Sequence, residues 1–117
     1  MGLEVHIDEQ NTHLSIQARG RYCLEDLRDL FDRLIKESDA RGESRIILDL
    51  TEVGGFIPTM DTHSLGEHCS KIWKQTLRVA IISPAGGLDE FFQIVARNRG
   101  VPLAVVSSHA AAADWLE

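Results

Sequence analysis

The sequence predicts a single α/β domain with a mixed, mostly parallel five-stranded sheet and four helices, in the order β-β-α-β-α-β-α-β-α. Residues 3–8 and 13–18 alternate apolar and polar side chains, which is the period of a half-buried strand. Residues 24–35 repeat apolar side chains every three to four positions, which is the period of an amphipathic helix. Strand and helix patterns then alternate to the end of the 117 residues, so we expect a parallel sheet and one domain over residues 1–117.

An antiparallel hairpin is expected at the start of the chain. Its strands are Leu3–Asp8 and His13–Ala18, in which every second residue is apolar. The polar residues Glu9–Asn11 form the turn between them, and the hairpin ends at Gly20. This hairpin places one antiparallel strand at an end of the sheet.

The first helix is predicted from Leu24 to Arg41–Gly42. Mostly charged residues separate its apolar positions, so the helix should bury one stripe and expose the rest of its surface. The stripe consists of Leu24, Leu27, Leu30, Phe31, Leu34 and Ile35.

A buried strand, a loop and a second helix follow. Arg45–Leu50 is a short, almost continuous apolar run with β-branched residues, which is typical of a central strand. Gly54, Gly55 and Pro58 then break the chain into a loop. The helix is expected from about Met60 to Gln75, with a buried side formed by Leu65, Cys69, Ile72 and Trp73.

The remainder of the chain repeats this alternation. Leu77–Ser83 is predicted to be another buried strand, and Leu88–Arg99 a helix that ends at Gly100. Val101–Val106 is the fifth strand. A serine at 107 or 108 can cap a final helix over Ala110–Leu116, which should pack on the sheet through Trp115 and Leu116.

Composition excludes several classes of function. Acidic residues outnumber basic ones by 18 to 12, the net charge is −6, and no basic stripe is present, so binding of nucleic acid is not expected. No apolar run approaches the ~20 residues that a membrane span needs, and the first residues lack the pattern of a signal peptide. With only two cysteines, far apart, a cytoplasmic location without disulfides is expected.

The residues that could carry chemistry do not form a catalytic or metal-binding pattern. His63 and Glu67 share a helix face, but His63 and His68 point apart, and neither HExxH nor CxxC occurs, so no metal or cofactor is expected. Cys69 lies on an apolar stripe, and no general base can be placed beside Cys23. The chain is therefore not expected to be an enzyme.

Several segments, taken in order, are similar to a known family. They are Arg45–Thr51, Asp61 with Leu65 and Gly66, Leu77–Ile82, Asn98–Gly100 and Ala113–Leu116. On these segments and on the element order, nearly the whole chain resembles a STAS domain, the fold of bacterial anti-sigma factor antagonists. It resembles most the STAS/SEC14-like branch of small bacterial proteins.

This resemblance directs attention to the start of the second helix. In the antagonist branch a serine there is phosphorylated, and His63 stands at the matching position, with Ser64 at the position of a glycine. The loop from Asp49 to Asp61 is also longer than in that branch. The resemblance therefore implies a surface that acts by contact, although three residues remain candidate phosphoacceptors: Thr59, Thr62 and Ser64.

The leading hypothesis is a non-enzymatic binding or regulatory module that contacts a protein or a small ligand at the loop 54–62 and the start of the second helix, beside the loop 84–88. Its expected binding residues are Phe56, Ile57, Met60, Asp61, Thr62, His63 and Ser64. One alternative is a carrier of a small lipophilic ligand, held in a cavity under Phe56, Ile57, Met60 and Phe91. The other is a phosphorylation-switched anti-sigma factor antagonist. A homodimer is compatible with any of these.

Overall fold

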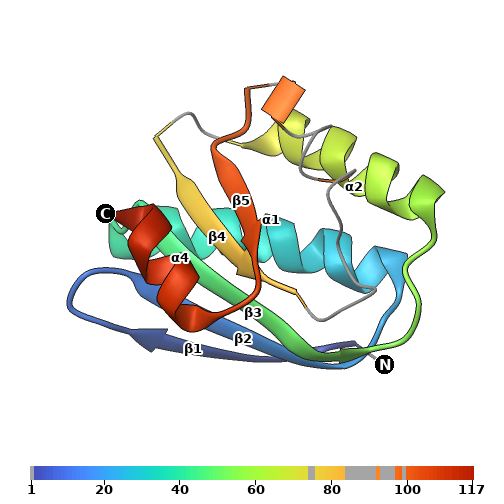
Figure 1. The fold of residues 1–117 in the computed structure, drawn as a ribbon, viewed down its shortest axis with the longest axis horizontal. Coiled ribbons are helices and arrows are strands. Elements are labelled where there is room, and N and C mark those ends of the chain that lie inside the picture. Colours follow the sequence, from blue (N-terminus) through green and yellow to red (C-terminus); the bar gives the residue numbers. More distant parts are fainter. Residues whose placement is uncertain (1, 74–75, 84–91, 93–96, 99) are drawn as a thin grey trace.

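The structure, a computed structural model, describes residues 2–73, 76–83, 92, 97–98 and 100–117 (Figure 1). Its strands and helices alternate as the sequence periods predicted. In chain order they are β1 (Glu4–Glu9), β2 (Leu14–Arg21), α1 (Leu24–Arg41), β3 (Arg45–Gly54), α2 (Thr59–Ile72), β4 (Arg78–Ile82), β5 (Leu103–Val106) and α4 (His109–Leu116).

The five strands lie side by side in chain order, β1-β2-β3-β4-β5. β1 pairs antiparallel with β2, so that Ile7 stands opposite Ile16. The three other ladders are parallel, and Leu48 of β3 stands opposite Ile16 on one side and Ile81 on the other. The predicted mixed, mostly parallel sheet with an antiparallel strand at one end is confirmed.

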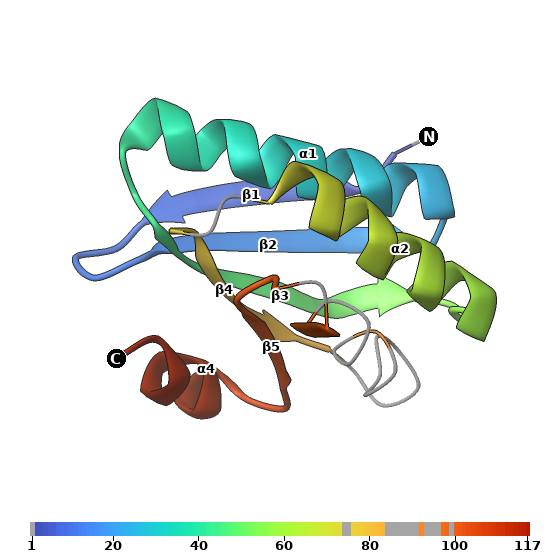
Figure 2. The same ribbon diagram turned by 90° about the horizontal axis from the view of Figure 1, so that it is seen from above.

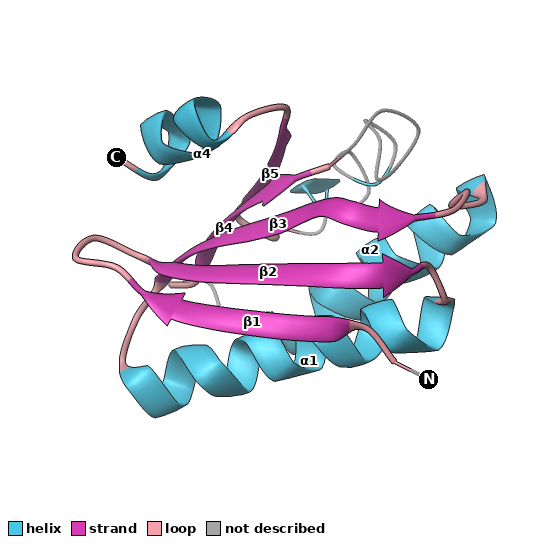
Figure 3. Ribbon diagram, turned by 90° about the horizontal axis from the view of Figure 1, so that it is seen from below, coloured by secondary structure: helices cyan, strands magenta, loops and turns pink. Residues whose placement is uncertain are grey.

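Helices lie on both faces of the sheet but cover them unequally. α1 and α2 lie on one face, and the shorter α4 lies on the other face (Figure 2, Figure 3). The larger core is under α1 and α2, where Phe31 and Leu65 are fully buried against Leu48 and its neighbours. A smaller core joins α4 to β3 and β4 and contains Ile47, Ala80, Ile82, Ala112 and Leu116.

α1 forms where the apolar stripe was predicted, and it ends where glycine permits a reversal. Its buried side chains are Leu27, Leu30, Phe31 and Leu34. Burial of each such side chain stabilises the fold by about 1.5–3 kcal/mol of transfer free energy. Gly42 follows the helix with a φ of 65°, a left-handed conformation that favours glycine, and its amide donates to the carbonyl of Ser38.

β3 is longer than the predicted Arg45–Leu50, because its pairing with β2 continues past a bulge to Gly54. After the register shift, Arg19 stands opposite Glu52, and the strand ends with one more buried side chain, Val53. The exposed residues Thr51 and Glu52 interrupt the apolar pattern, so the sequence did not predict this extension. Gly54 therefore ends a strand, and the loop begins at the next residue.

The bounds of the helices also differ from those predicted. α2 ends at Ile72 instead of Gln75, because Trp73 is already extended, with a φ of −75° and a ψ of 142°. The helix predicted over Leu88–Arg99 falls mainly outside the described residues. Of its apolar stripe, Phe92 is described, and it is fully buried with its ring 6.1 Å from that of Phe31. Three of the four expected helices are thus found in the described part of the chain.

α4 begins one residue earlier than predicted, at His109, and is capped as expected. The Ser108 hydroxyl accepts a hydrogen bond of 3.1 Å from the amide of Ala111. Leu116 is buried in the smaller core, whereas Trp115 is half-buried, with its ring 4.7 Å from the Arg78 guanidinium. Among the described residues, no helix has both the length and the apolar character needed to cross a bilayer.

Candidate functional site

The predicted binding residues lie at the junction between β3 and α2. They occupy residues 54–64, which comprise the last residue of β3, a short loop and the first residues of α2. We call this region the α2 edge. Its N-cap, Pro58, has no side chain that can accept a hydrogen bond, so residues of other elements fix the position of the helix.

The apolar side chains of the α2 edge divide into one that is buried and two that are exposed. Ile57 is only 9% exposed and belongs to the larger core, whereas Phe56 is 76% exposed and Met60 is 83% exposed. The apolar segment is therefore neither wholly buried nor wholly exposed. Ile57 anchors the loop, and Phe56 and Met60 face solvent.

The space beneath the loop is small. It is lined by Tyr22, Leu27, Leu50, Val53, Gly55, Ile57 and Ser83 and has a volume of about 10 Å³. A cavity needs roughly 10–15 Å³ to hold one water molecule. Phe91, the remaining residue expected to line a lipophilic cavity, lies outside the described residues.

Tyr22, just before the N-cap of α1, holds the α2 edge at two points. Its hydroxyl donates a hydrogen bond of 2.7 Å to Oδ2 of Asp61, and its backbone amide donates to the carbonyl of Gly54 at 2.8 Å. Its Cβ also lies 3.5 Å from where a Cβ on Gly55 would stand; Gly55 has a φ of 104°, which favours glycine. Burial, the hydrogen bond to Asp61 and the negative charge of Asp61 all raise the pKa of Tyr22.

Arg28 forms the second link between the two helices. Its Nη2 donates a hydrogen bond of 3.0 Å to the hydroxyl of Ser64. Its Nε is buried and has no hydrogen-bond acceptor among the described residues. Sequence reasoning missed both Tyr22 and Arg28, because each contact joins residues 36 or more positions apart.

The three candidate phosphoacceptors have different environments. Thr62 is fully buried, and its hydroxyl donates a hydrogen bond of 2.7 Å to the carbonyl of Thr59. Thr59 itself is exposed, and Ser64 is half-buried against Arg28. A kinase could therefore reach Thr59 directly, whereas the Thr62 hydroxyl is enclosed in the fold.

The histidines of α2 separate as predicted. His63 is exposed, and its Nδ1 lies 2.8 Å from Oε1 of Glu67, one turn further along the helix. His68 instead faces α1, where its Nε2 lies 2.9 Å from Oδ1 of Asp32. Among the described residues, no group of three His, Cys, Asp or Glu side chains is arranged to hold a metal ion.

Cys69 does not have the surroundings of an activated thiol. Cys69 is buried in the larger core, and this burial, together with the charge of Asp32, raises the pKa of its thiol. A thiol that stays protonated is a poor nucleophile. Cys23 is exposed at the N-cap of α1.

A separate polar cluster lies on the other face of the sheet. Asp49 of β3 is only 7% exposed, and its Oδ1 accepts hydrogen bonds from the amide and the hydroxyl of Thr51, at 2.9 and 2.6 Å. Its Oδ2 lies 3.0 Å from Nε2 of His109 at the start of α4. Burial alone would raise the pKa of Asp49, but the bonds from Thr51 and the contact with His109 lower it overall.

No protein-family model and no curated protein matches the sequence. The fold, by contrast, matches solved structures. An anti-sigma factor antagonist from Mycobacterium paratuberculosis superposes with a TM-score of 0.63 at 12% identity, over 98% of this chain and 94% of that one. An uncharacterised protein of the DUF3478 family from Shewanella loihica, described as having a SpoIIAA-like fold, superposes with a TM-score of 0.55 at 24% identity, over 99% of this chain and 94% of that one.

These matches agree with the resemblance found in the sequence. The chain has a SpoIIAA-like, that is STAS-like, fold with a five-stranded mixed sheet, shared with an anti-sigma factor antagonist. At identities of 12% and 24%, the likeness concerns the fold alone.

Proposed function

We propose that this chain is a non-enzymatic binding module that docks a protein partner on the α2 edge. The observation that carries the proposal is the exposure of Phe56 and Met60, which are 76% and 83% exposed and belong to the same short segment of the chain. They are the large apolar side chains that stand exposed in the described part of the molecule. An exposed apolar group of this kind gains free energy when a partner covers it.

The backbone that carries Phe56 and Met60 is held in place by neighbouring contacts, which favours binding. Ile57 is buried between them, Tyr22 holds Asp61, and Arg28 holds Ser64. Because the backbone that presents Phe56 and Met60 is already ordered, association would lose little loop entropy. An aromatic side chain next to a flexible methionine is also the kind of pair on which interface energy concentrates.

The shape of the α2 edge supports a protein partner over a lipophilic small molecule. The space under the loop, about 10 Å³, is far below the several hundred Å³ of a typical ligand pocket. Polar residues follow the exposed pair along α2: Asp61 comes directly after Met60, and the His63–Glu67 pair lies further along the helix. An apolar centre with a polar rim is typical of protein interfaces. One structural neighbour is named an anti-sigma factor antagonist, which agrees with a role in protein association.

The proposal is tested by comparing three forms of the protein as baits in an extract of the source organism. The forms are the wild type, Phe56→Ser/Met60→Ser, and a matched control, Ala110→Ser/Ala113→Ser, on the exposed side of α4. We expect one protein to be enriched by the wild type and the control and reduced about tenfold or more with the first variant. Equal capture by all three baits, or a retained lipophilic molecule in native mass spectrometry, would contradict the proposal.

A second candidate, the phosphorylation-switched antagonist, has one observation in its favour. The hydroxyl of Ser64 lies 3.0 Å from Nη2 of Arg28, whose buried Nε has no acceptor in the described part of the chain. A phosphate on Ser64 could accept from both nitrogens. Phosphoproteomics of the source organism distinguishes the two functions, because substantial occupancy at Ser64 or Thr59 favours the switch and its absence favours contact alone.

A further inference from the structure

β1 is an outer strand of the sheet, and alternate backbone groups on it have no partner strand among the residues that the structure describes. The amide of Gln10 donates to the carbonyl of His13 at 2.9 Å, which fixes the alternation of the ladder. In an antiparallel pair every second residue bonds to the neighbouring strand through its backbone. The backbone amides and carbonyls of Glu4, His6 and Asp8 therefore point toward β2. The backbone amides and carbonyls of Val5 and Ile7 therefore point away from the sheet.

A groove runs beside this edge, between β1 and α1. It has a volume of about 160 Å³, and Leu3, Val5 and Leu30 supply its apolar lining. Asp26, Asp29 and Arg33 of α1 also line it. A strand added to β1 would direct every second side chain toward this groove, and the remaining side chains would point to the other face of the sheet.

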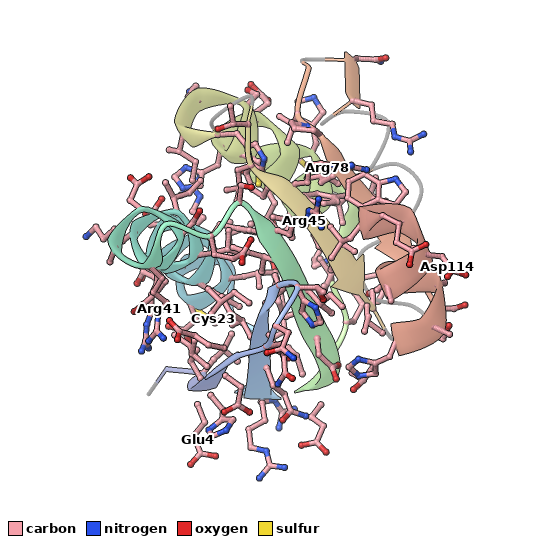
Figure 4. The ribbon with its side chains drawn as sticks, turned by 90° about the vertical axis from the view of Figure 1, so that its left-hand side faces the viewer. Glu4, Cys23, Arg41, Arg45, Arg78 and Asp114 are labelled. Atoms are coloured by element: carbon pink, nitrogen blue, oxygen red, sulfur yellow. The ribbon has the colours of Figure 1, made fainter. Side chains whose placement is uncertain are left out.

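The charges around the β1 edge are mainly acidic. Glu4, Asp26 and Asp29 have no ion-pair partner among the residues that the structure describes. By contrast, the nearby arginines are committed to other groups: Arg19, opposite Glu4 on β2, to Glu52, Arg33 to Glu37 at 4.0 Å, and Arg41 to Glu37 and Glu9 at 3.0 Å each. Figure 4 shows Glu4 and Arg41 on the same side of the molecule.

This charge pattern decides between two occupants of the edge. If two copies paired β1 with β1, Glu4 and Asp8 of one copy would lie near those of the other. Like charges across paired strands are destabilising, so the edge opposes pairing with a second copy. A strand that carries lysine or arginine on its polar side would instead meet opposite charges.

We infer that β1 is a docking site for an extended basic segment of a protein partner, which adds to the sheet as a sixth strand. Its backbone pairs with the outward groups of Val5 and Ile7, its apolar side chains lie toward the groove beside α1, and its basic side chains face Glu4 and Asp8. Main-chain hydrogen bonds supply affinity in such additions, and the alternating side chains supply specificity. This surface is separate from the α2 edge, so it adds a second contact to the proposed function.

The test uses the full chain and two synthetic peptides of about six residues, the length of a strand such as β1. One peptide alternates Val and Lys, the other alternates Val and Glu, and both have blocked ends. With the Val–Lys peptide, amide exchange at Val5 and Ile7 should slow about tenfold, while the inward amide of His6 changes less. The Val–Glu peptide should have no effect.

Charge exchange on the protein provides the matched control. Glu4→Lys/Asp8→Lys, on the face that the basic side chains would meet, should weaken binding of the Val–Lys peptide about fivefold and allow the Val–Glu peptide to bind. Asp114→Lys/Glu117→Lys makes the same change in net charge on α4, which Figure 4 shows on the opposite side from Glu4, and should leave binding unchanged.

The inference is overturned if neither peptide slows exchange at Val5 and Ile7 at millimolar concentration, or if both peptides bind equally. Perturbation confined to Phe56 and Met60 would also overturn it, because the peptide would then occupy the α2 edge. Since the two surfaces share no residue, this result leaves the test of the proposed function unaffected.

Discussion

The hydroxyl of Tyr22 donates a hydrogen bond of 2.7 Å to Oδ2 of Asp61, and this bond connects the residue just before the N-cap of α1 to the first turn of α2. The two helices lie on the same face of the sheet (Figure 2). The bond therefore sets the position of α2 relative to α1 as well as the conformation of the α2 edge.

Replacing Tyr22 with Phe should destabilise the fold and loosen the α2 edge. The variant keeps the ring but leaves a carboxylate without its donor, and a hydrogen bond to a charged group contributes about 1.5–3 kcal/mol. We expect a loss toward the lower end of this range, because Asp61 is half-buried and water can replace the donor. Denaturant unfolding measures the loss, and faster amide exchange at residues 55–61 would confirm its location. An unchanged midpoint would mean that the bond does not hold the edge.

The same residue predicts an alkaline limit to stability. The pKa of Tyr22 is raised in the folded chain above its ordinary value of 10.0, so the folded state holds the proton more tightly than the unfolded state. The resulting stabilisation is complete below pH 10.0 and is lost as the pH rises toward the folded pKa. Tyr22 is the one tyrosine of the chain, so the ultraviolet absorbance of tyrosinate reports it directly. Native protein should ionise at a higher pH than protein in denaturant, and equal midpoints would refute the prediction.

Asp49 predicts an acid limit. Its pKa is lowered from 3.8, mainly through the two bonds from Thr51, so its contribution is present above pH 3.8 and is lost as the pH falls through the folded pKa. Thr51→Val should cost about 1–2 kcal/mol near neutral pH and less in acid. His109→Ala should cost less, because the His109 side chain is 66% exposed. Urea unfolding at several pH values separates the two, and a cost for T51V that does not change with pH would contradict the assignment.

Substitutions at neighbouring residues of the α2 edge should have very different effects on the free energy of unfolding. Ile57→Ala removes a buried side chain and should cost about 2–4 kcal/mol. Phe56→Ser and Met60→Ser alter exposed side chains and should change the free energy of unfolding by no more than about 0.5 kcal/mol. Thermal unfolding of the three variants is sufficient, and a large loss for F56S would show that this ring packs against the protein.

Removal of residues 110–117 should destabilise the fold by several kcal/mol. Leu116→Ala alone should destabilise it by about 2–4 kcal/mol. Leu116 is 4% exposed in the smaller core, and the half-buried Trp115 adds its contact with Arg78. Ala113→Ser, on the exposed side of α4, is the control and should have little effect. If the truncated chain melts with the full-length protein, α4 does not contribute to the core.

Periodicity was sufficient to predict most of the fold, because burial dictates the pattern of apolar residues. α1 and the hairpin formed by β1 and β2 follow their patterns closely, since each buries one face only. The end of β3 does not, because its pairing past the bulge depends on β2, some thirty positions earlier in the chain. The local sequence of β3 therefore does not predict where its pairing with β2 ends.

The candidate site was predictable in place but not in detail. The glycines and the apolar residues after β3 indicated an exposed loop, and the break in the family pattern indicated the start of α2. Which side chain turns inward depends on space left by Leu27 and Leu50, and the sequence does not specify that space. The contacts from Tyr22 and Arg28 likewise arise only when α1 and α2 are packed on one face.

The strand order of the sheet has a consequence for synthesis on the ribosome. Because the described strands are arranged in the order in which they occur in the chain, each new strand pairs with one that has already emerged. No strand has to be inserted between two that are already paired, and the hairpin of β1 and β2 offers a local starting point. The sheet can therefore grow from one side as the chain is made, and α4 closes the smaller core once residues 109–116 have emerged.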